Sequence, residues 1–300
     1  MIGLNFLKSN LYNANFVKLK LSLEKLSKNN IYSFLFGIFA TMILQSSSAL
    51  TAIIIAFLGA NLIDLKPAIL IILASNIGTC LTPFIFALNI KYITFILFFI
   101  GYILILLKKN KLALIGNIII DVGFIFLGLR ITNYSISCFS ENGFFDIFFY
   151  NKQNNFLSFF LSILLTMITQ SSSLVIVITQ TLYQNDVFNL YQSLIFVLGS
   201  NIGTCIATYL YTFSFPSKVK IAIKVNIIFN ILSAFIFILL LKYFCHITLF
   251  IKNLLLLNKP ATIALFQLIF NFVPTIIIFM FYNKIYFLIS NYFIKDWHKQ

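Results

Sequence analysis

The sequence predicts an all-α polytopic membrane protein built from two inverted-topology repeats. Three observations support this fold class: the composition, the length of the uncharged segments, and a pair of motifs that occurs twice. Of the 300 residues, 61% are hydrophobic and only 9% are charged, whereas an ordinary soluble domain is about 25% charged. Because about 20 apolar helical residues cross a bilayer, the repeated apolar stretches predict several membrane helices.

The repeat is visible as two strings that recur at one offset. TMILQSSS at 41–48 becomes TMITQSSS at 166–173, and SNIGTC at 75–80 recurs unchanged at 200–205; both offsets are 125 residues, since 166 − 41 = 125 and 200 − 75 = 125. We call these the QSSS motif and the SNIGT motif. Their shared spacing indicates a duplication of one unit.

Each QSSS motif predicts a re-entrant helical hairpin. The uncharged stretch around the first motif, 29–63, is 63 − 29 + 1 = 35 residues long, which is too long for one crossing of about 20 residues and too short for two. The second stretch, 153–185, has the same property. Each SNIGT motif, which contains a glycine, predicts a transmembrane helix that breaks there.

Lysine placement sets the expected topology, because cytoplasmic loops carry an excess of Lys and Arg. The lysines at 108, 109 and 111 and at 218 and 220 fall inside, which gives the two halves opposite orientations. Lys242, Lys252 and Lys259 then fall outside, against the rule. The expected organisation is a basic cytoplasmic tail (1–30), a first transport repeat (31–130), an extracytoplasmic loop (131–155), a second transport repeat (156–282) and a C-terminal segment (283–300). The expected crossings are 67–88, 92–107, 112–130, 190–213, about 225–241 and 261–282, with hairpins at 31–61 and 156–184.

The motifs supply neutral oxygen and nitrogen groups inside apolar segments, where unsatisfied polar groups are costly. Serine hydroxyls and the N–H groups of a helix N-terminus suit a tetrahedral oxyanion. Carbonyl, amide and hydroxyl oxygens suit an alkali cation. The candidate substrate and ion ligands are Gln45, Ser46, Ser47, Ser48, Asn76, Gly78, Thr79, Gln170, Ser171, Ser172, Ser173, Asn201, Gly203 and Thr204.

Several other features have two possible interpretations. Small residues also pack helices closely, so a single such motif favours packing, whereas its duplication favours a binding site. Asp121, an acid well inside a predicted span, is either a cation or proton ligand or a structural partner, for example of Arg130. Cys138 and Cys245 both fall in predicted outside loops, where a disulfide is an alternative to two free thiols. Lys220 and Lys224 either attract phosphate or snorkel at a helix end.

Both motifs, twice and in this order, resemble those of the sodium-dependent phosphate cotransporter family of bacteria and animals. The resemblance covers about 31–282 and includes two Phe-Asn pairs, at 229–230 and 270–271. It implies a sodium:phosphate symporter that works by alternating access, with the QSSS residues along the pathway. The chain departs from the family at Cys80 and Cys205, where threonine is common, and at Asn226 and Gln267, where histidine is frequent. Bacterial members often append a phosphate-uptake-regulator-like domain, which this sequence is expected to lack.

The predicted function is secondary active transport of inorganic phosphate with Na⁺ across the plasma (inner) membrane, with both termini cytoplasmic. We expect no cofactor, transition metal or nucleic-acid partner. The chain is expected to be embedded in the lipid bilayer. The alternatives are a proton-coupled transporter or one for another oxyanion such as sulfate or arsenate, an ion channel, and an intramembrane serine hydrolase. The hydrolase needs a base near a motif serine, and both histidines, His246 and His298, lie outside the predicted spans.

Overall fold

The computed structural model describes residues 29–88, 92–107, 110–142, 155–210, 212 and 215–291. Every regular element in these ranges is a helix. Among the described residues, five segments are long and apolar enough to cross a membrane: Leu65–Ala87, Lys111–Phe139, Leu190–Leu210, Ser217–Leu239 and Lys259–Met280. The prediction of an all-α membrane protein is therefore confirmed. The predicted tail falls outside the described residues up to position 28, and so does the C-terminal segment from position 292.

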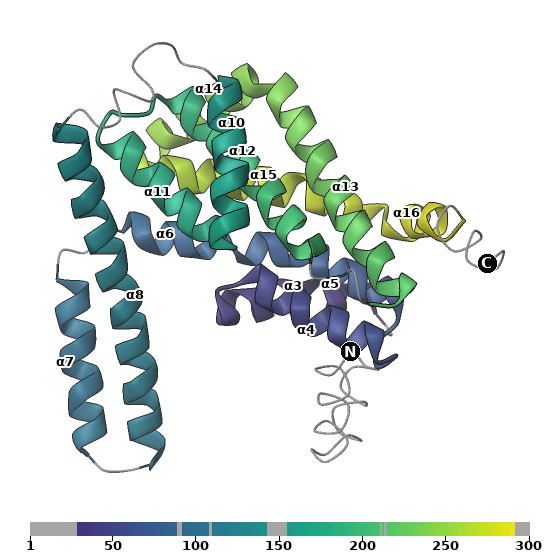
Figure 1. The fold of residues 1–300 in the computed structure, drawn as a ribbon, viewed down its shortest axis with the longest axis horizontal. Helices are drawn as coiled ribbons and strands as arrows, with labels where there is room; N and C mark the ends of the chain where they lie inside the picture. Colours follow the sequence, from purple (N-terminus) through teal and green to yellow (C-terminus); the bar gives the residue numbers. More distant parts are fainter. Residues whose placement is uncertain are drawn as a thin grey trace.

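In chain order, the helices divide into two consecutive groups (Figure 1). The first comprises α3 (Asn30–Leu44), α4 (Ser47–Gly59), α5 (Leu65–Gly78), α6 (Leu81–Ala87), α7 (Ile93–Leu106) and α8 (Asn110–Glu141). The second comprises α10 (Asn155–Thr169), α11 (Ser172–Gln184), α12 (Leu190–Leu210), α13 (Ser217–Leu239), α14 (Leu241–Leu254), α15 (Lys259–Met280) and α16 (Tyr282–Ile289).

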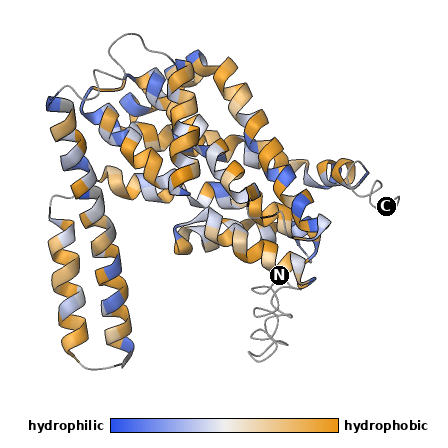
Figure 2. Cartoon of the chain, in the orientation of Figure 1, coloured by the Kyte–Doolittle hydropathy of each residue, from blue (hydrophilic) through white to orange (hydrophobic). Residues whose placement is uncertain are grey.

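Helices α7 and α8 pack against each other and project from the rest of the bundle (Figure 1). Apolar residues predominate along the helices (Figure 2). The exposed side chains include Ile43, Phe99, Ile168 and Leu239, each more than half exposed. A soluble protein rarely shows such wide apolar patches, whereas hydrocarbon tails solvate them readily.

The two central helices are α5 and α12, which carry the SNIGT motifs. The α5 side chains from Ala68 to Ala74 are almost completely buried, and so are those of α12 from Ser193 to Leu198. One apolar cluster packs α5 against α3, α4 and α13, and another packs α12 against α14 and α15. Since α13 joins the first cluster, a helix of the second half completes the core of the first.

Matching glycines let a neighbouring helix approach each central helix. A Cβ atom on Gly78 would lie 2.6 Å from the carbonyl oxygen of Ile38 on α3. A Cβ atom on Gly203 would lie 2.6 Å from the carbonyl oxygen of Ile163 on α10. Both glycines, which the sequence predicts at helix breaks, lie at close helix contacts, the use that small residues have at membrane-helix interfaces. Gly78 is also the last residue of α5, whereas Gly203 lies inside α12.

Two segments that were predicted as loops are helical. Helix α8 continues past residue 130 to Glu141, so residues 131–141 correct the start of the predicted loop 131–155; residues 143–154 lie outside the described ranges. Thr132 and Ser137 donate to the carbonyl groups of Gly128 and Asn133, four residues earlier, so these polar side chains are satisfied within a helix. Helix α14 occupies part of the predicted connection after 241, with Leu241, Cys245 and Thr248 buried on one face.

Candidate functional site

The first QSSS motif forms the turn between α3 and α4. Gln45 takes a left-handed conformation, with φ 53° and ψ 22°, which ends α3. Ser46 is extended and caps α4, because its side-chain oxygen accepts a hydrogen bond from the backbone N–H of Ala49 at 3.1 Å. The Ser46 and Ser48 hydroxyls lie 3.0 Å apart. The turn therefore brings hydroxyl groups to the N-terminus of a helix, where the backbone dipole favours negative charge.

The second QSSS motif adopts the same conformation between α10 and α11. Gln170 has φ 55°, and Ser171 caps α11 by accepting from the N–H of Leu174 at 3.3 Å. Ser172, like Ser47 in the first turn, is less than a tenth exposed. The sequence signal for both turns was the polar cluster near the middle of each uncharged stretch.

The two turns line one pocket. Its lining residues are Gln45, Ser46, Ser47, Ser48, Thr79, Gln170, Ser171, Ser172, Ser173 and Thr204. All ten were predicted as site residues, and they come from both copies of the motif pair. All ten side chains are polar and uncharged. The cavity has a volume of about 20 Å³, which is room for about one water molecule.

The other four predicted residues do not line this pocket. Gly78 and Gly203 sit at the helix contacts described above. The Asn201 side chain donates to the Val197 carbonyl on its own helix at 2.9 Å. The Asn76 backbone carbonyl accepts from the Thr79 hydroxyl at 2.7 Å, and the Asn76 side-chain nitrogen is buried without a hydrogen-bond partner within the described chain. The two asparagines are therefore not among the residues that line the pocket.

Only the first SNIGT motif interrupts a helix. Helix α5 ends at Gly78 and α6 begins at Leu81, whereas α12 runs unbroken from Leu190 to Leu210, so the predicted break in the second copy is wrong. The difference follows from Pro83, which has no N–H to donate to the carbonyl four residues earlier and clashes with it. The matching residue, 83 + 125 = 208, is Thr208, whose hydroxyl donates to the Thr204 carbonyl at 2.8 Å.

The two glutamines of the pocket differ in their surroundings. The Gln45 side-chain oxygen accepts from the Thr82 hydroxyl and its nitrogen donates to the Met42 carbonyl, each at 2.5 Å. The residue that matches Thr82 is Ala207, since 82 + 125 = 207, and it offers no hydroxyl. The Gln170 side chain is exposed. Hydrogen bonds therefore hold the glutamine side chain on the first side of the pocket, whereas the glutamine on the second side is exposed.

The family described as Na⁺/Pi-cotransporter matches the chain twice in succession, over residues 1–134 and 135–258. The chain belongs to this family. It is a family of phosphate transporters rather than enzymes, which agrees with the resemblance carried by the motifs. Each family match contains one QSSS motif and one SNIGT motif, so the boundary between the matches falls between the two copies.

Relatives among known proteins extend the likeness over most of the chain. The transporter is 30% identical to the uncharacterized protein YqeW of Bacillus subtilis, over 96% of this chain and 93% of that protein. It is 24% identical to YjbB of Escherichia coli K12, named as a proposed inorganic phosphate export protein, over 88% of this chain and 48% of YjbB. The chain thus spans about half the length of YjbB. No solved structure matches the chain.

The remaining candidates of the transporter lie away from this pocket. Asp121 is exposed on α8, and Arg130 lies over the ring of Phe95, 5.7 Å from its centroid, rather than against the carboxylate. Cys138 and Cys245 are free thiols, so the disulfide alternative is not realised in this structure. Within the described ranges, no group of His, Cys, Asp and Glu residues could hold a metal ion.

Two contacts behind the pocket were missed by sequence reasoning. The Asn271 side chain of α15 donates to the Cys80 sulfur, and the Asn226 side chain of α13 donates to the Cys205 sulfur, both at 3.5 Å. Each cysteine directly follows a pocket threonine. The sequence did contain a signal for these contacts. The two cysteines occupy matching motif positions, Asn271 belongs to the second Phe-Asn pair, and Asn226 precedes the first pair. Only the fold shows that these groups meet.

Proposed function

We propose that the protein couples the movement of inorganic phosphate to that of Na⁺ across the plasma membrane by alternating access, with both termini in the cytoplasm. One observation carries the proposal: serine turns from both copies of the repeat line a single uncharged, hydroxyl-rich pocket. A site assembled at the junction of two repeats is typical of secondary transporters.

The pocket suits phosphate because it offers donors from several directions. Six serine hydroxyls donate or accept as needed, and the first turns of α4 and α11 add backbone N–H groups and the positive ends of two helix dipoles. Hydrogen bonds to an ionised acceptor are shorter and stronger than neutral ones. An anion is therefore favoured without a lysine or arginine among the lining residues.

The same pocket suits Na⁺ because its hydroxyl and amide oxygens are hard ligands. The lining residues include no carboxylate to neutralise a cation, so a bound phosphate would supply the balancing negative charge. This mutual dependence is the physical basis for coupling: each ion lowers the electrostatic cost of binding the other. Na⁺ is a transported ion here, not a resident cofactor.

The small size of the cavity supports a mechanism in which the site opens to bind its substrates. At about 20 Å³ it holds about one water molecule rather than a phosphate with its ion. The two serine turns must therefore separate to admit substrate. The helices end at Gln45 and Gln170, which allows each hairpin tip to move relative to the neighbouring central helix. Opening toward one side of the membrane and then the other gives alternating access.

Transport in proteoliposomes tests the coupling. With the purified full chain and radiolabelled phosphate, an inward Na⁺ gradient is expected to drive uptake above equilibrium, and its collapse by a sodium ionophore is expected to abolish accumulation. Equal uptake with Na⁺ or choline refutes sodium coupling, and accumulation driven by a proton gradient instead favours the proton-coupled alternative. Because YjbB is named for export, efflux from phosphate-loaded vesicles is measured in parallel.

Serine substitutions test the site itself. Ser47→Ala and Ser172→Ala each remove a hydroxyl from the pocket, and we expect each to raise the KM for phosphate roughly ten- to a hundredfold, the value of a hydrogen bond to a charged group. Ser193→Ala is the matched control, because Ser193 is also buried on a core helix and donates to its own helix, at the Asn189 carbonyl. Unchanged KM values in both pocket variants, with folded protein, would show that the motif only packs helices.

A further inference from the structure

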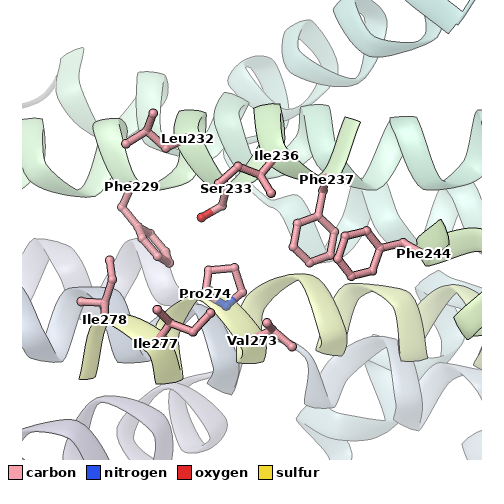
Figure 3. Close-up of a pocket in the computed structure, with 10 residues that line it drawn as sticks. All are labelled: Phe229, Leu232, Ser233, Ile236, Phe237, Phe244, Val273, Pro274, Ile277 and Ile278. Carbon is pink, nitrogen blue, oxygen red and sulfur yellow. The ribbon is translucent and has the colours of Figure 1, made fainter. Parts of the chain in front are cut away.

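A second pocket lies between α13, α14 and α15, apart from the serine turns (Figure 3). Its volume is about 270 Å³, well above the roughly 150 Å³ of an apolar cavity that stays dry and binds benzene. The lining residues are Phe229, Leu232, Ser233, Ile236, Phe237, Phe244, Val273, Pro274, Ile277 and Ile278. Ser233 alone among them has a polar side chain, so the pocket suits a hydrocarbon and not a solute.

The walls of this pocket follow from three sequence features. Pro274 lies inside α15, where it has no N–H to donate to the carbonyl four residues earlier. Phe237 and Phe244 stack with their ring centroids 3.8 Å apart and close one end, as Figure 3 shows. Phe229 is buried and lies at the opposite end of the pocket (Figure 3).

The mouth of the pocket opens on the outer surface of the bundle. Leu232 and Ile236 of α13 are 55% and 50% exposed, and Ile277 of α15 is 52% exposed. Both helices are apolar and long enough to cross the membrane. In a bilayer this surface faces lipid, so the molecules that reach the mouth are lipid acyl chains.

A positive charge lies on the exposed surface of α13, about two turns before the mouth. Lys224, Ile228, Leu232 and Ile236 follow one another at intervals of four residues, and all four side chains are exposed. Residues four apart are neighbours on a helix surface, so this row leads step by step from Lys224 to the mouth. Lys224 is eight residues from Leu232, which is about 12 Å along the helix axis. That span matches the step from a lipid headgroup down to the middle of its chain within a hydrocarbon layer of about 30 Å.

We propose that this pocket binds one acyl chain of an anionic phospholipid whose headgroup phosphate pairs with Lys224. The charge complementarity at Lys224 selects a negatively charged headgroup, and the carbon-lined cavity takes the chain. A lysine or arginine near the membrane surface attracts anionic lipid headgroups. The site is separate from the phosphate pocket and does not depend on the transport function proposed above.

Photolabelling tests this proposal. The full-length protein is placed in phosphatidylcholine nanodiscs that contain a trace of phosphatidylglycerol with a diazirine near the middle of one chain, and the labelled peptides are mapped by mass spectrometry. We expect labels concentrated on residues 229–236 and 273–278. Equal labelling of the exposed helices α7 and α8 would overturn the proposal.

Two variants with matched controls test the parts of the site separately. Ser233→Phe fills the pocket and is expected to abolish the concentrated labelling, whereas Ile231→Phe adds the same ring on the outer face of α13 and is expected to leave it. Lys224→Ala is expected to lower labelling roughly fivefold, since one lysine at an anionic surface contributes about 1 kcal/mol, and Lys242→Ala on α14 is expected to leave it. A phosphatidylcholine probe that labels as strongly as phosphatidylglycerol would refute the anionic headgroup, and unchanged labelling in Ser233→Phe would refute the pocket.

Discussion

Replacing Gly203 with alanine tests whether the contact between α10 and α12 positions the serine-lined pocket. The new Cβ atom would lie 2.6 Å from the carbonyl oxygen of Ile163 and 2.7 Å from Cβ of Thr166, where unstrained contacts are about 3.5–4.0 Å. A backbone carbonyl cannot rotate away, so the helices must separate by on the order of 1 Å. Overpacking of this kind costs about 1–3 kcal/mol, and the displaced backbone carries the next residue, Thr204, which lines the pocket.

The expected result is a lower Tm in detergent together with a loss of phosphate uptake. A displacement of about 1 Å at a reacting or binding group can cost on the order of a hundredfold in rate, so uptake is expected to fall by at least about tenfold. Gly128→Ala on α8 is the control, because a Cβ atom there has no neighbour within 4 Å, and Tm and uptake are expected to be retained. Wild-type Tm and wild-type uptake in Gly203→Ala would refute the role assigned to this contact.

The differences between the two copies give two further predictions. Gln45→Leu leaves the Thr82 hydroxyl without its acceptor and is expected to lower the free energy of unfolding by about 1–3 kcal/mol. Gln170→Leu, at an exposed position, is expected to change it by less than about 0.5 kcal/mol. Both variants are expected to lower uptake, and equal losses of Tm would contradict the difference between the two copies. Thr208→Pro places in α12 the residue that interrupts the first copy at Pro83. It is expected to cost about 3 kcal/mol or more and to lower Tm, and an unchanged Tm would show that α12 is not held as a continuous helix.

The sequence was sufficient to predict the helical membrane fold and the positions of the two serine turns. Both follow from local chemistry: long apolar stretches form helices, and a Gln-Ser-Ser-Ser string in such a stretch offers a left-handed residue and an N-cap. The sequence could not show which motif side chains face inward, because this depends on neighbours from distant segments. Asn201 turns back onto its own helix, and Gly203 is explained by α10, which precedes it by some 40 residues in the chain.

Helix ends were the least predictable feature, for a related reason. The polar run after residue 130 contains hydroxyl side chains that bond within the helix, as Thr132 does, so polarity there did not imply a loop. The second SNIGT motif has the same sequence as the first and yet stays helical. What differs lies outside the motif, at the residues that follow it, and a comparison restricted to the repeated strings could not reveal the difference.

The divergence just after the SNIGT motif gives the two sides of the pocket different chemistry. On the first side, Thr82 holds Gln45, and Pro83 supplies no N–H to the carbonyl of Thr79, which lines the pocket. On the second side, Thr208 donates to the carbonyl of Thr204 through its hydroxyl. A carbonyl spared by a proline is more available to a cation than one already accepting a hydrogen bond. The duplicated motifs therefore do not make a symmetric site, and we expect an anion and a cation bound together to sit unequally between the two halves.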